Sequence, residues 1–178
     1  MSRADKFEAL VHYICWRCQD PTKLGATKLN KILWFSDAIS FVSHGKPITD
    51  SIYVKRQFGP VPKKILQTLS RLERANKLAI RETEHFGKPK REFFAKEPAD
   101  ISVFTPEEIS LVDDVVGKIC EGHTAASISG LTHDDVWELA EIGEEIPLYA
   151  VLAGRAGEVD EETMKWAKQE AERLGYAE

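Results

Sequence analysis

Apolar side chains recur at helical spacing in the first 45 residues of the chain, and they predict two helices. The first helix ends at Asp20-Pro21, because proline has no amide hydrogen with which to continue the ladder. Its apolar stripe comprises Phe7, Leu10, Val11, Ile14, Cys15 and Cys18. The second helix runs from about Thr27 to His44-Gly45, where glycine permits a left-handed closing residue. Its inward positions are expected to be Leu29, Ile32, Leu33, Ile39 and Val42.

The same spacing predicts further helices in the rest of the chain. One is expected from Val61 to about Asn76-Lys77, and its inward residues are expected to be Ile65, Leu66, Leu69 and Leu72. Another begins at Thr105-Pro106-Glu107-Glu108, a capping-box pattern with proline at the first helical position. Its inward residues are expected to be Ile109, Val112, Val115, Val116 and Ile119. Shorter helices are expected at 124–130, 133–142 and 160–174, with a hinge at 154–157.

Two segments read as β-structure. Residues 50–57 are β-branched and aromatic and alternate in part, which predicts a short strand. Residues 78–97 give two alternating runs, which predict a hairpin with a longer loop at 86–89. Between these segments, Gly59 allows a sharp turn, while Pro60 and Pro62 suit the first turn of a helix.

These elements predict a mainly α fold with a small β element, namely a short strand plus a basic β-hairpin. A chain of 178 residues with 43% hydrophobic content suits one domain with a core of its own. We assign residues 1–153 to this domain. Residues 154–178 are expected to form an acidic C-terminal helix that packs on the domain or extends it.

The composition indicates in which compartment the protein is found and whether it needs a disulfide or a cofactor. No apolar run approaches the roughly 18 residues of a membrane span, and the charged N-terminus differs from a signal peptide. Three cysteines fit reduced thiols better than a disulfide framework. We therefore expect a cytoplasmic protein with no membrane partner, no disulfide and no cofactor.

Charge is divided unevenly along the chain. Residues 1–100 carry 19 Lys and Arg against 11 Asp and Glu, whereas residues 101–178 carry 5 against 18. Such asymmetry indicates charged partners, because surface charge steers encounters with molecules of opposite sign. The alternative is that the two halves pack against each other.

Cysteine and histidine spacing offers a metal hypothesis. Cys15 and Cys18 together with Cys120 and His123 form a formal three-cysteine, one-histidine zinc set, provided that two helix ends meet. Cys15 and Cys120 also lie on apolar stripes, where a buried thiol behaves as a small hydrophobe. We favour the second interpretation and expect no metal.

A second cluster, His133-Asp134-Asp135 with Glu138, could be a metal or acid/base site. Helix capping by Thr132, with acidic residues in the first turn, explains the cluster more simply. The sequence has no Ser/His/Asp order, HExxH, Walker loop or GxGxxG motif, so we do not expect an enzyme.

Basic residues favour a different class, DNA-binding regulators. A basic helix at 61–76 followed by a hairpin at 78–97 with a basic tip imitates a winged helix. The basic residues are Lys63, Lys64, Arg71, Arg74, Lys88, Lys90 and Arg91. A pI near 5.6, however, is far from the basic value typical of such modules. The alternative is that these basic residues form a solvent-exposed face that binds no nucleic acid.

Three stretches together resemble the Panacea domain of bacterial and phage antitoxins, the group that includes SocA-like proteins. They are KLNKILWFSDAISFVSHGKPI at 28–48, VKRQFGPVPKKI at 54–65 and LTHDDVWELAEIGEEIP at 131–147. The resemblance covers roughly residues 5–153. It implies a mostly α-helical antidote that binds its cognate toxin without catalysis, and it also implies an adaptor that delivers the toxin to the ClpXP protease.

A protein of this kind needs a rigid patch with aromatic and arginine anchors, and the glycine-proline turn is our candidate. The proposed partner-binding residues are Tyr53, Arg56, Phe58, Gly59, Pro60, Lys63, His133 and Trp137. The alternative is that Tyr53 and Phe58 fill the core. For Trp34 and Trp137, core packing is the favoured interpretation, because large aromatic side chains are mostly buried.

Overall fold

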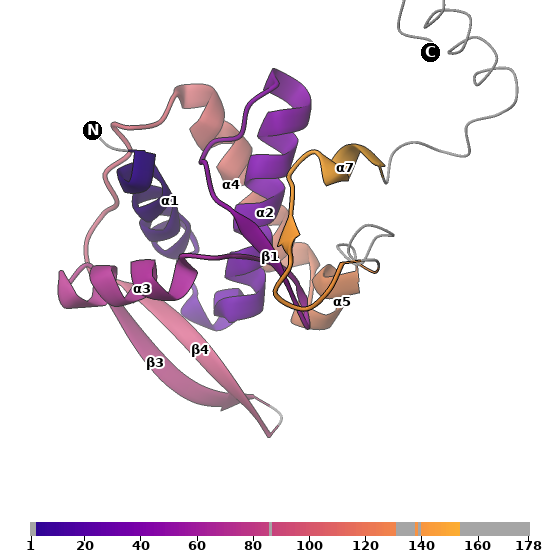
Figure 1. Cartoon of the computed structure of the whole chain (residues 1–178). Coiled ribbons are helices and arrows are strands. Elements are labelled where there is room, and N and C mark those ends of the chain that lie inside the picture. The colour runs from indigo at the N-terminus through magenta and orange to yellow at the C-terminus, as the bar shows by residue number, and fades with distance from the viewer. Residues whose placement is uncertain (1–2, 86, 131–137, 139, 154–178) are drawn as a thin grey trace, which may run out of the picture.

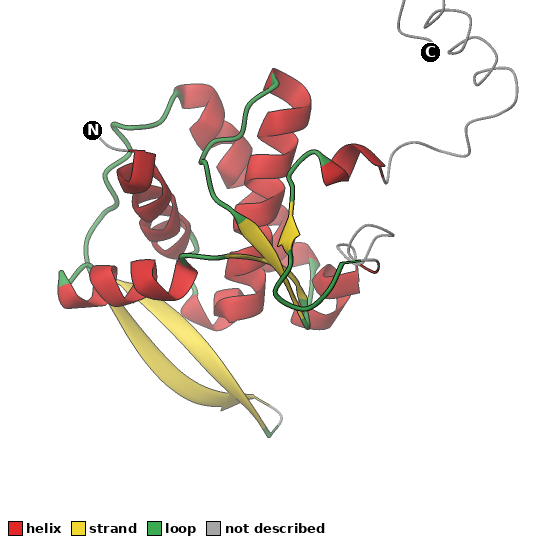
Figure 2. Ribbon diagram, viewed as in Figure 1, coloured by secondary structure: helices red, strands yellow, loops and turns green. Residues whose placement is uncertain are grey.

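The computed structural model describes residues 3–85, 87–130, 138 and 140–153 (Figure 1). Its helices are α1 (Arg3–Arg17), α2 (Pro21–His44), α3 (Ile65–Arg74), α4 (Pro106–Gly122), α5 (Ala125–Gly130) and α7 (Ala150–Ala153). Its strands are β1 (Tyr53–Arg56), β2 (Gly59–Pro62), β3 (Leu78–His85), β4 (Lys88–Ala95) and β5 (Glu145–Ile146). Helices predominate and the strands form two small sheets, which confirms a mainly α fold with a small β element (Figure 2).

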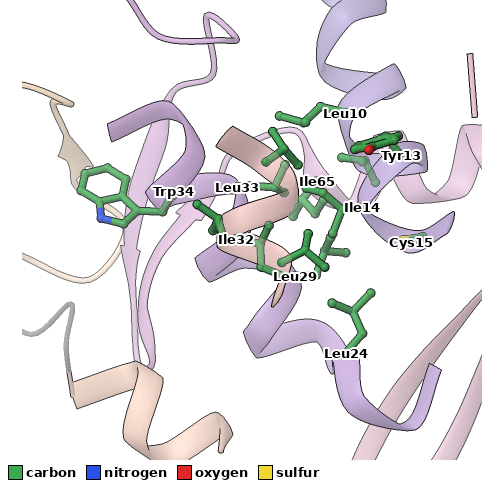
Figure 3. Close-up of a cluster of buried hydrophobic side chains, with 14 of the residues drawn as sticks. Leu10, Tyr13, Ile14, Cys15, Leu24, Leu29, Ile32, Leu33, Trp34 and Ile65 are labelled. Carbon is green, nitrogen blue, oxygen red and sulfur yellow. The ribbon is translucent and has the colours of Figure 1, made fainter. Parts of the chain in front are cut away.

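The core lies where α1, α2 and α4 pack together. Leu10 and Ile14 of α1 gather with Leu29, Ile32 and Leu33 of α2 in one cluster (Figure 3). All five side chains are at most 1% exposed. Because burying one such side chain contributes about 1.5–3 kcal/mol, these five residues make a large contribution to the stability of the fold.

Helix α2 is bounded and bent by features that the sequence contains. Asp20 caps its start by accepting a hydrogen bond from the Thr22 amide at 3.0 Å. Gly25 then breaks the helical path with φ 67°, and Gly45 closes the helix with φ 71°. The regular part after Gly25 therefore matches the predicted helix from about Thr27.

The predicted inward face of α2 is partly wrong. Ile39 and Val42 are 42% and 37% exposed, whereas Trp34 and Ala38 are buried. Helix α2 packs against β2 as well as other helices, and Trp34 contacts Tyr53 of β1, so part of its buried face is turned toward the sheet.

Helix α4 is formed as predicted. Thr105 accepts a hydrogen bond from the Glu108 amide, and the Glu108 carboxylate accepts one from the Thr105 amide. Four of its expected inward residues are buried and Ile109 is half-buried; the four are Val112, Val115, Val116 and Ile119.

The three-stranded sheet has the order β2-β1-β5, and its strands are antiparallel. Arg56 pairs with Gly59, so Gln57 and Phe58 alone form the turn between β1 and β2. Only β1 was expected here. Strand β5 has two residues, and a pattern that short carries no readable period.

Our expectation that Pro60 and Pro62 begin a helix is wrong, because both lie in β2 and α3 starts at Ile65. The Lys63 amide bonds to the Ile52 carbonyl, so the alternation of the ladder turns the nitrogens of Pro60 and Pro62 away from β1. Both prolines are buried. An amide hydrogen at either position would be buried without a ladder partner, and proline has none.

The β3–β4 hairpin is confirmed, although its loop is shorter than predicted. His85 pairs with Lys88, which leaves two residues between the strands, and Gly87 adopts φ 74°.

In α3, Leu66 is 65% exposed and therefore does not face inward as expected, while Thr68 is buried in the helix. Helix α5 matches the prediction for 124–130. The predicted elements at 133–142, 154–157 and 160–174 lie wholly or mostly outside the described residues.

Candidate functional site

The β1–β2 hairpin is fixed to the helices through Tyr53. The Tyr53 ring meets the Trp34 ring edge to face, with centroids 5.0 Å apart and an interplanar angle of 77°. The Tyr53 hydroxyl donates a hydrogen bond to Asp37 Oδ2 at 2.8 Å. Tyr53 is 2% exposed, so one end of the hairpin is held in the core.

Asp37 of α2 organises a buried polar network under the hairpin. Its carboxylate accepts hydrogen bonds from the Thr49 amide at 2.7 Å and from the Thr49 hydroxyl at 2.6 Å, in addition to the one from Tyr53. Ser51 lies within 2.8 Å of the same Thr49 hydroxyl. Burial raises the pKa of Asp37 to about 6, although the hydrogen bonds oppose that shift.

The opposite end of the hairpin is exposed and carries an aromatic side chain beside an arginine. Phe58, in the turn, is 57% exposed, and Arg56 beside it is also exposed. On the other side of β1, the Gly143 amide donates to the Lys55 carbonyl at 2.9 Å, which places the 65% exposed Ile142 at the same end of the sheet. We call Arg56, Phe58 and Ile142 the hairpin-tip surface.

Two lysines hold the segments around the hairpin in place. Lys55 Nζ donates to the carbonyls of Ala140 at 2.9 Å and Glu138 at 3.3 Å. Lys63 pairs with Glu145 of β5 at 3.2 Å, an exposed ion pair that contributes little to stability. The position of Ile142 is therefore set mainly by backbone pairing and by the half-buried Lys55 contacts.

The structure separates the predicted binding residues into three groups. Tyr53, Gly59 and Pro60 are buried, which favours the interpretation that they support the hairpin and do not contact a partner. Arg56, Phe58 and Lys63 are exposed and remain candidates. His133 and Trp137 lie outside the described residues, as does most of the predicted cluster around His133.

Sequence reasoning missed two parts of this site. It did not single out Ile142, an isolated apolar residue in a polar run, because its exposure depends on the pairing of 143–146 with β1. It also did not identify Asp37, whose partners Thr49 and Tyr53 are 12 and 16 residues away.

The basic helix and basic hairpin of the DNA hypothesis lie next to each other (Figure 1). Many of their charges, however, already have partners. Arg71 pairs with Glu8 at 3.0 Å, and Arg91 pairs with Glu82 at 3.3 Å. Lys90 pairs with Glu92 at 3.2 Å. These contacts reduce the positive charge that the surface presents to a phosphate backbone.

The four residues of the formal zinc set are not brought together. Cys18 and Cys120 meet with their sulfurs 3.3 Å apart, but Cys15 is buried in the core and His123 lies near Ser127 at 3.3 Å. In the part of the chain that the structure describes, no three His, Cys, Asp or Glu side chains are grouped to hold a metal ion. The helix ends do meet, but only as a pair of thiols.

Comparison with known proteins identifies one family. The model of the family described as "Antitoxin SocA-like, Panacea domain" matches residues 29–138. No curated protein and no solved structure matches the chain. The matched region includes α2 from Leu29 onward, the β1–β2 hairpin and α4. Among the described residues, no helix has both the length and the apolar character needed to cross a membrane.

Proposed function

Since the chain belongs to the family of SocA-like antitoxins with a Panacea domain, we propose that it neutralises a cognate toxin protein by binding it directly. The family match covers more than half of the chain, and it includes the hairpin that carries the exposed aromatic residue. Binding of a toxin requires no chemical reaction catalysed by this chain, and we propose that the protein is not an enzyme.

The observation that supports the binding surface is the exposure of Phe58 on a fixed support. An aromatic side chain contributes most to an interface when it is held rigid before binding, because little conformational entropy is then lost. Phe58 follows a strand anchored by the Trp34, Asp37 and Tyr53 contacts, so its backbone is held in place. Arg56 beside it adds a second residue type that is enriched at the centre of interfaces.

The family resemblance also motivates a second step, in which the bound toxin is delivered to the ClpXP protease. Neutralisation by masking and neutralisation by degradation differ in stoichiometry and in the need for a protease. Masking needs one antitoxin for each toxin, whereas an adaptor acts repeatedly and depends on the protease. Toxin inhibition by purified protein in the absence of protease would therefore favour masking.

We expect that co-expression will rescue cells from the toxin. The product of the neighbouring gene should arrest growth when expressed alone, and this chain should restore growth and co-purify with it. Colony counts and affinity capture of a tagged chain measure the two results. A neighbouring product that is harmless alone, or that fails to co-purify, contradicts the antitoxin proposal.

We expect Phe58→Ala to weaken toxin binding by about 10- to 100-fold, the loss typical of an aromatic residue at the centre of an interface. Calorimetry or surface-based binding with the purified toxin measures the change in Kd. Phe58 is 57% exposed, so the free energy of unfolding should change by no more than about 1 kcal/mol.

Ile101→Ala is the matched control for this variant. Ile101 is 47% exposed and lies in the connection between β4 and α4, away from the hairpin tip. The control should leave the Kd unchanged. If both variants bind with the wild-type Kd, the toxin uses another surface, and the antitoxin proposal then stands without this site.

DNA binding by a winged-helix-like regulator is the alternative function. Lys64 and Arg74 of the basic surface are exposed, and α3 contacts β3 of the hairpin as a wing would. Retardation of the chain's own promoter DNA, weakening steeply with salt, would favour this alternative. The ion pairs of Arg71 and Arg91 make it the weaker of the two proposals.

A further inference from the structure

Two cysteines far apart in the sequence meet at the junction of three helices. Cys18 follows the last residue of α1, and Cys120 lies in the last turn of α4. Their sulfurs are 3.3 Å apart, although 102 residues separate them in the chain. A disulfide bond has a sulfur–sulfur distance of about 2.05 Å, so the two sulfurs would have to approach by only about 1 Å.

The surroundings of the pair favour a reactive thiolate on Cys18. A hydrogen bond joins the two sulfurs, and this contact lowers the pKa of Cys18 and raises the pKa of Cys120. Lys28 donates to the Cys120 carbonyl at 3.2 Å, and its positive charge also favours the Cys18 thiolate. A thiolate next to a protonated thiol is the arrangement of a nucleophile and its resolving cysteine.

The third cysteine does not compete in the folded chain. Cys15 is 2% exposed and lies within the core, where burial raises the pKa of its thiol. Cys18 and Cys120 are 6% and 8% exposed, so neither residue is sealed completely from solvent. Reaction of the folded protein is therefore directed to Cys18, and its nearest thiol is Cys120.

We propose that Cys18 and Cys120 form a reversible disulfide when the protein meets a peroxide. The Cys18 thiolate attacks one peroxide oxygen, the oxygen–oxygen bond breaks, and after proton uptake the products are a sulfenic acid and one water. The Cys120 sulfur then attacks the Cys18 sulfur, the sulfur–oxygen bond breaks, and a second water leaves with the Cys120 proton. Two thiols and hydrogen peroxide thus become one disulfide and two waters, and a dithiol reductant restores the thiols.

This bond would join the α1–α2 junction to α4 and close a covalent loop of about 100 residues. Cross-links across loops of that length stabilise proteins chiefly by restricting the unfolded chain. We expect the oxidised protein to unfold at a temperature about 5 to 10 °C higher than the reduced protein. The inference is independent of the proposed toxin, because it concerns the chain alone.

The experiment treats the purified full chain with hydrogen peroxide under native conditions. Mass spectrometry should show a loss of two hydrogens and a peptide cross-link between Cys18 and Cys120, and thiol titration should fall from three to one. The same oxidation in denaturant provides the control, because the short loop then favours Cys15–Cys18. The ratio of Cys18–Cys120 to Cys15–Cys18 disulfide is expected to be more than tenfold higher in the native protein than in denaturant. If the native protein gives no cross-link, or gives Cys15–Cys18, the proposal is wrong.

Variants separate the bond from a general effect of oxidation. Cys15→Ser should still form the cross-link and still gain thermal stability on oxidation. Cys18→Ser and Cys120→Ser should do neither. If a serine variant fails to fold, the pairing measured in the wild-type chain decides the question. A rise in unfolding temperature that survives in Cys120→Ser would also contradict the proposal.

Discussion

Trp34→Ala is expected to lower the free energy of unfolding by about 4 kcal/mol, because it removes a large buried side chain and leaves a cavity. Trp34 is 4% exposed and contacts the Tyr53 ring edge to face at 5.0 Å. Loss of that aromatic pair contributes about 0.5–1.5 kcal/mol of the effect. Urea unfolding followed by circular dichroism measures the change without depending on tryptophan fluorescence.

Two variants serve as controls for this result. Trp16 is 41% exposed, so Trp16→Ala should cost about 1 kcal/mol or less. Trp34→Phe keeps an aromatic ring against Tyr53 and should cost less than half as much as Trp34→Ala. A loss below about 1 kcal/mol for Trp34→Ala would show that Trp34 does not anchor the hairpin.

Asp37 is expected to make the protein less stable as the pH rises from about 4 to about 6. Burial raises its folded-state pKa from 3.8 to about 6, so the folded chain binds this proton more tightly than the unfolded chain. Stability therefore falls through that window, by about 3 kcal/mol for this one group. The sign is opposite to that of a carboxylate whose pKa is lowered by folding.

Asp37→Asn isolates the effect of this group, since the amide has nearly the same shape and does not titrate. The free energies of unfolding of both chains are measured by urea titration from pH 4 to pH 7. The stability of the wild type relative to Asp37→Asn should fall as the pH rises. A constant difference over this range would mean that Asp37 does not change its protonation state there.

Local signals in the sequence predict much of the fold. The capping box at Thr105 and Glu108 marks the start of α4 because both partners lie within one turn. Gly45 marks the end of α2 for a similar reason, since its left-handed conformation depends on that residue alone. The hairpin at 78–97 is predicted because two long alternating runs flank a glycine.

Features that depend on tertiary packing could not be predicted. Pro60 and Pro62 have the same fixed φ in a helix start and in an edge strand, and only the ladder with β1 distinguishes these two cases. Leu66 and Ile39 lie on apparent apolar stripes but are exposed, because the neighbouring elements cover other faces of their helices. Lys31 of α2 shows the reverse, being 1% exposed although lysine is normally a surface residue.

In the candidate sites, too, local sequence signals identify residues, whereas tertiary packing determines their exposure and contacts. Arg56 and Phe58 were singled out from residue type, while their exposure at the tip depends on the core position of Tyr53. The zinc hypothesis grouped Cys18 with Cys120, because Cys18 ends one Cys-x-x-Cys motif and Cys120 begins a Cys-x-x-His motif. Their contact, however, depends on the packing of α4 beside α2. Residue types therefore suggested the candidates, and the geometry decided which of them can interact.

The two prolines of β2 also restrict how other chains can associate with this sheet. Strand β2 is at an edge of the sheet and packs against α2, and its prolines offer no amide hydrogen on the side away from β1. An incoming extended segment would find no donors there with which to continue the ladder. This edge is thereby protected against amyloid-like growth and strand exchange, and recognition at the hairpin is left to side chains.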